Sequence, residues 1–113
     1  MKAAKDRNAT ARFACMLAAM EPTRLNIVRL LLKAHPEGLV VGEIAAELGM
    51  ANSTLSHHLD KLKNEGLVSV QREGTFLRCA ADAAGLEELL GFLYAECCTR
   101  NKAVEPRRVV CCS

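Results

Sequence analysis

The stretch that decides the fold is Asn52-Ser-Thr-Leu-Ser-His-His-Leu-Asp-Lys-Leu-Lys63. Its leucines, at positions 55, 59 and 62, recur at helical spacing and predict an amphipathic helix that buries its leucine face. At about 100° per residue, burial of that face turns Ser53, His57 and Lys61 outward. Thr54 and Ser56 fall on the flanks. Hydroxyl, imidazole and ammonium groups can reach base edges or phosphates in a major groove, so these five residues predict a DNA-reading surface.

The residues before this helix predict the first half of a helix-turn-helix. Apolar residues at positions 41, 44, 45 and 48 recur at helical spacing, and Gly49 follows them, so a short helix is expected to end there. Asn52 or Ser53 is expected to cap the helix that follows. With this context, an ordinary solvated helix face is the less favoured interpretation.

The two adjacent histidines are expected to behave differently. His58 lies close to the buried edge of the helix, so packing or capping is favoured over a DNA contact. His57 is favoured as a phosphate or base contact over a catalytic group, because no nucleophile or carboxylate is suitably spaced around it.

The residues after the helix predict a β-hairpin wing. Gly66 stands where a helix C-terminal glycine is expected, and residues 67–72 and 75–80 read as two strands about a turn at Glu73-Gly74. Arg72 near the tip is expected to touch a phosphate or an adjacent minor groove, and Arg78 is a weaker candidate. A solvated hairpin without DNA contacts is the alternative.

Apolar stripes also predict helices at both ends of the chain. The first covers Phe13 to Met20, a second runs from Thr23 to near His35, and the last starts at Asp82. The fold class is therefore mainly α with a β-hairpin wing, a winged helix-turn-helix. The end helices have few partners in so small a domain, so they are expected to pair across a two-fold axis as a homodimer. Residues 1–100 are expected to form the DNA-binding and dimerisation domain, and residues 101–113 a flexible tail that contains cysteines.

Composition sets limits on location and chemistry. The net charge of +2 is too mild to predict nucleic-acid binding without local clustering. No apolar run reaches the roughly 18 residues of a membrane span, so a cytoplasmic protein without a membrane partner is expected. In that reducing compartment the six cysteines are not expected to form a disulfide framework, and they indicate thiol chemistry with a soft ligand or an oxidant. No phosphate loop, Cys-x-x-Cys or acid/base pair indicates an enzyme or an organic cofactor.

Three stretches then carry a family resemblance: Glu21-Pro-Thr-Arg-Leu-Asn-Ile, Ser53-Thr-Leu-Ser-His-His-Leu-Asp-Lys-Leu and Gly66-Leu-Val-Ser-Val-Gln-Arg-Glu-Gly. They resemble the ArsR/SmtB family of metal- and metalloid-responsive repressors over residues 10–98. The resemblance implies a dimer that binds a palindromic operator on double-stranded DNA without inducer and leaves it when inducer binds.

The chain departs from two sensor patterns of that family. A Cys-Val-Cys cluster at the third helix is replaced by Val40-Val41-Gly42, and the last helix begins Asp82-Ala-Ala-Gly and ends Ala95-Glu-Cys-Cys without histidine. The ligands are therefore expected among this chain's own thiols.

Cys97 and Cys98 are the expected core of the inducer site. Cys79 lies about 22 Å away along the last helix of the same subunit, but the family's antiparallel last helices would bring it toward the partner's pair. Cys111 or Cys112 of the tail is the rival third ligand, and Cys15 is a weaker one. Three thiolates suit arsenite or antimonite, and two suit a methylated trivalent arsenical.

Several alternatives remain open at this stage. A thiol-redox switch or a cadmium, lead or zinc sensor would keep the same fold, and an architectural DNA-binding protein would have no sensor. Cys97 and Cys79 could each be small core residues, and the tail cysteines could be idle.

Overall fold

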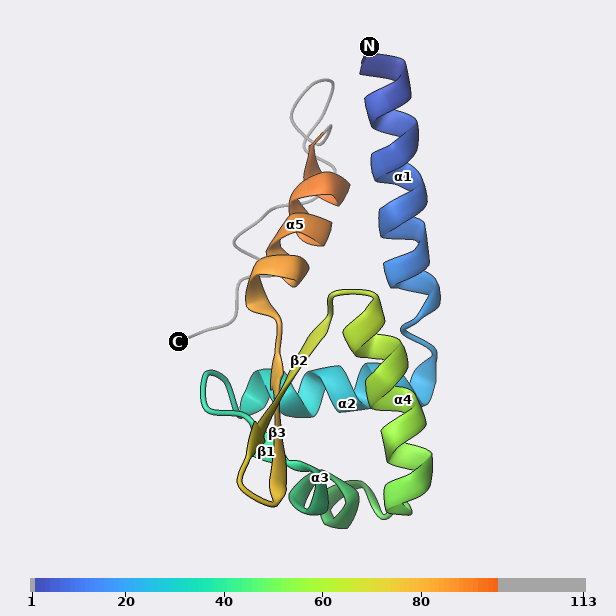
Figure 1. The fold of residues 1–113 in the computed structure, drawn as a ribbon. Helices are drawn as coiled ribbons and strands as arrows, with labels where there is room; N and C mark the ends of the chain where they lie inside the picture. The colour runs from blue at the N-terminus through green and yellow to red at the C-terminus, as the bar shows by residue number, and fades with distance from the viewer. Residues whose placement is uncertain (1, 96–113) are drawn as a thin grey trace.

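The computed structural model describes residues 2–95 of the chain, with side chains from Asn8 onward. Their elements, in chain order, are α1 (Lys2–Ala18), α2 (Pro22–Lys33), β1 (Leu39–Val40), α3 (Val41–Leu48), α4 (Asn52–Asn64), β2 (Val68–Glu73), β3 (Phe76–Ala81) and α5 (Ala83–Tyr94). Helices α1 and α5 rise side by side from a lower body, which contains α2, the α3–α4 pair and the hairpin (Figure 1). This arrangement confirms the predicted winged helix-turn-helix. No described helix is long and apolar enough to cross a membrane.

Helix α2 runs through the middle of the core. Its Ile27, Val28 and Leu31 are buried, as the dense apolar run in this segment predicted. Leu55 and Leu62 of α4 are fully buried in the same cluster. Packing against α2 therefore helps to hold α4 in place.

The sheet has a third strand that the sequence did not reveal. Its order is β1-β3-β2, antiparallel throughout, and Cys79 of β3 lies between Leu39 of β1 and Val70 of β2. Gly38 precedes β1 at φ +77°, and a Cβ there would collide with the backbone oxygen of Cys79. The tight approach therefore requires glycine at this position.

Besides α1, which spans Lys2–Ala18 where a helix over Phe13 to Met20 was predicted, two boundary predictions were wrong in detail. The N-cap of α4 is Ala51, with no capping hydrogen bond from a side chain, so Asn52 and Ser53 lie inside the first turn. The hairpin turn falls at Gly74-Thr75, one residue later than predicted. The first difference matters for function, because it leaves the Ser53 hydroxyl free of a capping role.

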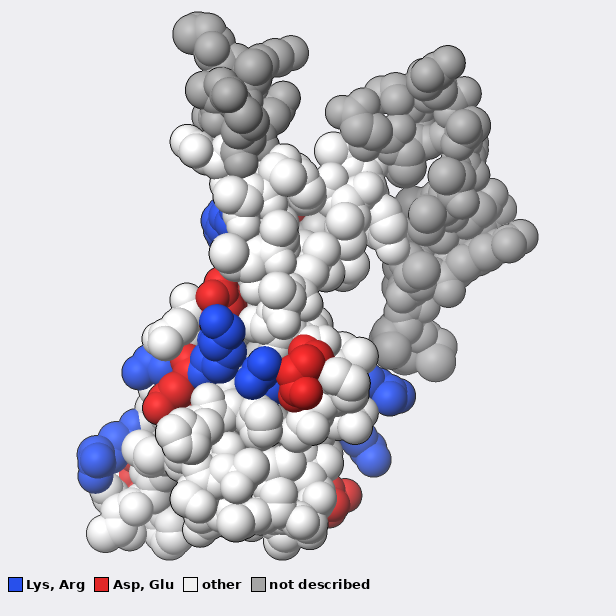
Figure 2. Space-filling view, turned by 90° about the vertical axis from the view of Figure 1, so that its right-hand side faces the viewer, with Lys and Arg blue, Asp and Glu red and all other residues white. Residues whose placement is uncertain are grey.

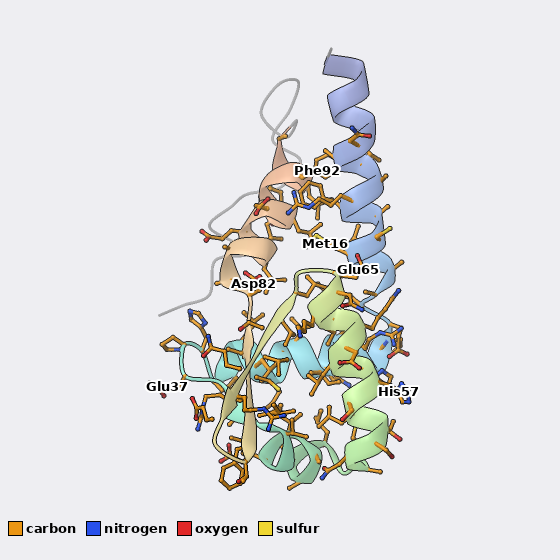
Figure 3. The ribbon with its side chains drawn as sticks, viewed as in Figure 1. Met16, Glu37, His57, Glu65, Asp82 and Phe92 are labelled. Carbon is orange, nitrogen blue, oxygen red and sulfur yellow. The ribbon has the colours of Figure 1, made fainter. Side chains whose placement is uncertain are left out.

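The start of α5 is fixed against the end of α4. The Asp82 carboxylate accepts a hydrogen bond from the Gly85 N–H at 3.0 Å, and the Asp82 N–H donates to the Leu67 oxygen at 2.9 Å. Gly85 packs against the Gly66 carbonyl with no room for a Cβ. The two helices are therefore coupled at this corner, near the labelled Asp82 in Figure 3.

Candidate nucleic-acid interface

The outward face of α4 is polar and unoccupied by the rest of the protomer. Ser53, Thr54, Ser56 and His57 are all exposed. Within residues 8–95, none of their side chains makes a hydrogen bond or an ion pair. His57 lies on the outer side of the helix, away from the sheet (Figure 3). These groups remain predicted DNA contacts, and the fold leaves their donors and acceptors available.

Lys61 continues this face toward the end of α4. Its ammonium lies 3.8 Å from the Glu65 carboxylate, and its side chain is about half exposed. An exposed pair at this distance contributes at most about 1 kcal/mol, so a nearby phosphate can compete with Glu65 for the ammonium.

His58 has the structural role that the sequence predicted. It is partly buried, and its Nδ1 lies 3.2 Å from Nη1 of Arg24 on α2. The imidazole therefore belongs to the contact between α2 and α4 and is turned away from the DNA-reading face.

The two arginines of the wing differ in the contacts that they make within the protomer. Arg72 is exposed on β2. Arg78 donates through Nε to Glu73 at 2.9 Å and through Nη1 to the Gly38 oxygen at 3.4 Å. The hydrogen bond to Glu73 raises the pKa of Arg78, so this cation is committed within the protomer. Arg72 is therefore the better placed of the two for a phosphate.

The wing tip also carries an exposed aromatic residue that the sequence did not indicate. The Phe76 side chain is 62% exposed beside the turn, directly opposite Glu73. Phe76 belongs to a strand that reads as partly apolar, so its exposure could not be inferred from the alternation alone.

On the face of the molecule that carries α4, charge is not gathered into one large patch (Figure 2). On the face shown in Figure 2, lysines, arginines and acids occur in small mixed groups, and the lower end of the body is largely uncharged. This pattern agrees with a net charge of +2.

The structure gives Cys79 the properties of a core residue. Its side chain is 0% exposed, and burial raises the pKa of the thiol. Both features oppose thiolate formation and access from another subunit, which argues against the predicted role of Cys79 as a third ligand. Cys15 on α1 is exposed. Cys97, Cys98, Cys111 and Cys112 lie outside the described residues. Among residues 8–95, no group of three His, Cys, Asp or Glu side chains could hold a metal ion.

A second surface is as apolar as the α4 face is polar. We call it the apolar face. A groove of about 470 Å³ runs between α1, α2 and α5, and nearly all of its lining is nonpolar. Its apolar residues include Leu17, Met20, Leu25, Val28, Leu32, Leu86, Leu90 and Leu93. Above the groove, α1 and α5 are joined by stacking of Phe13 on Phe92 at 4.7 Å between ring centres and by the Arg12–Glu88 ion pair at 2.9 Å.

Known proteins resemble this chain in both sequence and fold. The sequence profile described as "Bacterial regulatory protein, arsR family" matches residues 21–70. The nodulation protein NolR of Rhizobium meliloti is 36% identical over 78 residues, which cover 68% of this chain and 62% of NolR. The transcriptional activator HlyU of Vibrio cholerae serotype O1 is 26% identical over 97 residues, 86% of this chain and 87% of HlyU.

A solved structure extends the likeness to three dimensions. Reduced HlyU from Vibrio cholerae N16961 superposes with a TM-score of 0.60 at 33% identity, over 78% of this chain and 94% of that one. This chain thus spans less than two thirds of NolR but most of HlyU. The matched family consists of regulatory proteins, which confirms the prediction of a regulator over an enzyme.

Proposed function

The chain belongs to the ArsR family of bacterial regulatory proteins, and from that premise we propose that it represses transcription as a homodimer released from operator DNA by trivalent arsenic. The observation that carries the DNA part is the outward face of α4. Three leucines of this helix are buried, while Ser53, Thr54, Ser56 and His57 are exposed without partners among the described residues.

In this proposal, the N-terminal half of α4 enters the major groove, as recognition helices of helix-turn-helix proteins do. His57 and the three hydroxyls read base edges or adjacent phosphates. Lys61 and Arg72 contact phosphates on either side, with Lys61 exchanging Glu65 for the DNA backbone. Two copies are needed, because one short helix offers too few contacts for a specific site.

The apolar face is the surface on which the second copy is proposed to bind. Leu90 and Leu93 are 48% and 50% exposed, and an exposed apolar groove of this kind marks an interaction surface. A second copy presents the same groove, so a two-fold pairing covers apolar residues with apolar residues. Arg29 and Glu87 also line the groove, and their opposite charges can pair across such an axis.

We assign the inducer-binding site to Cys97 and Cys98 because they are adjacent thiols and because they follow α5 closely in the sequence. Helix α5 ends at Tyr94, three residues before Cys97 in the sequence. Adjacent thiolates suit soft centres such as As(III) and Sb(III). Cys111 or Cys112 would supply the third thiolate for arsenite or antimonite, since Cys79 is buried. A methylated trivalent arsenical needs only the pair.

A second candidate keeps the fold and the thiols but changes the signal to oxidation. It is favoured by the structural likeness to a protein described as reduced HlyU. In that case the thiols near the end of α5 would form a disulfide or sulfenic acid, and dithiothreitol would reverse the effect without arsenic. Cadmium, lead or zinc sensing by the same thiols is distinguished by the same titration.

The test is fluorescence anisotropy of the reduced protein on DNA from upstream of its own gene. Arsenite, methylarsenite, antimonite, cadmium, lead, zinc and hydrogen peroxide are titrated in parallel. The proposal expects release by a trivalent arsenical at low micromolar concentration. Cys97→Ser with Cys98→Ser should bind DNA as the parent does but resist release, and Cys15→Ser is the matched control.

Each other outcome has a defined meaning. Release by peroxide alone supports the redox candidate, and release by cadmium or zinc alone replaces the inducer. Loss of DNA binding in the double cysteine variant makes the two thiols structural. Because one relative is named an activator, a promoter–reporter assay must show expression rising with the inducer for repression to stand.

A further inference from the structure

Arg24 lies where three helices meet. It belongs to the first turn of α2, and its backbone N–H donates to the Glu21 carboxylate, the N-cap of that helix, at 3.0 Å. Its side chain makes two further contacts. Nε donates to the Ala19 carbonyl at 2.6 Å, and Nη1 lies 3.2 Å from Nδ1 of His58. One guanidinium thus joins the end of α1 to the middle of α4.

The chemistry of this contact fixes its direction. A guanidinium only donates hydrogen bonds, so Nδ1 of His58 is the acceptor in this contact. The planar group holds its donors at fixed angles. A displacement of the Ala19 carbonyl therefore reorients the donor that faces His58.

The Ala19 end of this link adjoins the apolar face. Ala19 is fully buried, and it lies between Leu17 and Met20, which both line the groove. Leu25, the residue after Arg24, lines it as well. The Ala19 carbonyl therefore lies within two residues of side chains that a second copy would cover.

The His58 end adjoins the DNA-reading face. His58 is flanked in sequence by exposed His57 and buried Leu59, so its position is tied to the rotation of α4 about its axis. Thr54 lies one helical turn before it. The partner of His58 therefore acts on the same stretch of α4 that carries His57 and Thr54.

We propose that Arg24 is a positioning residue that transmits the setting of the apolar face to the recognition helix, through the Ala19 carbonyl and Nδ1 of His58. This inference rests on the proposed function, because it explains how an event at the α1–α5 pair reaches the DNA contacts. It assigns Arg24 no contact with DNA or inducer.

The first test measures transmission without DNA or inducer. Leu17→Ala perturbs the apolar face, and NMR follows the backbone amides of residues 53–57. The proposal expects clear shifts at these amides in the parent chain and shifts reduced by more than half in the Arg24→Lys background. Lysine keeps the charge but lacks the planar fork. Equal shifts in both backgrounds, or none in the parent, would overturn the proposal.

The second test is a double-mutant cycle on operator affinity, with Arg24→Lys and His58→Leu. Each single change should weaken binding about tenfold, within the usual range of coupling energies, and the pair should be no weaker than either alone. His58→Asn should restore binding, because its Oδ1 can accept in place of Nδ1. The control is Lys33→Ala, which removes a cation from the far end of α2, the helix that carries Arg24.

A hundredfold loss in the pair would show independent contributions and overturn the link. Melting temperatures of each variant separate misfolding from lost transmission, and the two His58 variants keep the test decisive should Arg24→Lys fold poorly. If the parent chain does not bind its operator, or arsenic does not release it, the proposed function fails. The amide shifts still decide the role of Arg24 in that case.

Discussion

Helices α4 and α5 have similar lengths, but α4 exposes a polar surface and α5 an apolar one. Helix α4 buries all three of its leucines and shows the solvent hydroxyl, imidazole and charged groups. Helix α5 buries Gly85 and Leu89 and leaves Leu90 and Leu93 about half exposed. The first helix has no apolar surface left for a protein partner, and the second has more than one protomer can cover. The difference is the basis for proposing a polar ligand for α4 and an apolar partner for α5.

The largest expected effect removes the apolar partner. Leu90→Asp with Leu93→Asp places charges in the proposed dimer contact, where a two-fold axis brings four leucines together. Burial of the exposed half of each side chain contributes about 1 kcal/mol, so the dimer should weaken about 1000-fold. Sedimentation velocity should show a monomer. Ala84→Asp adds the same charge to α5 outside the groove and should leave the dimer intact, whereas an intact dimer in the double variant would refute the assignment of α5.

The next effect tests the claim that the leucines of α4 belong to the core. Leu55 is fully buried, so Leu55→Ala should lower the free energy of unfolding by about 3 kcal/mol. Urea unfolding at fixed protein concentration measures it. The neighbouring Thr54→Ala should change stability by less than about 0.5 kcal/mol, and similar losses at the two positions would break the contrast between the faces.

A smaller effect tests the polar face itself. His57→Ala should weaken operator binding about tenfold, as the loss of a specific base contact does, with unfolding unchanged. Asn64→Ala, at the far end of α4, serves as control. Anisotropy on operator and on unrelated DNA gives the answer, since an equal loss on both would make His57 a phosphate contact.

The smallest effect concerns the end of the same face. Lys61→Gln should weaken binding to all sequences by a few-fold and lower the slope of log affinity against log salt by about one. The salt titration is the measurement. An unchanged slope would mean that the ammonium stays with Glu65 when DNA binds.

Local patterns predicted much of this molecule. Leucine spacing predicted α4, and the position of His58 at the buried edge predicted its structural role. Strand β1 was missed because two residues show no alternation, and it exists only because β3 offers it an edge. Cys79 was proposed as a ligand because sequence gives a thiol's position along the chain but not which side of a sheet it occupies.

The sequence by itself determined the order of elements, the polar outward face of α4 and the excess of leucine in α5. Periodicity and residue type suffice for these features, because each depends on neighbours within a few helical turns. The tertiary structure decided which leucines stay exposed, which wing arginine is committed to Glu73, and that Arg24 joins the Ala19 carbonyl to His58. These depend on contacts between residues far apart in the chain, and no local pattern encodes the packing that brings them together.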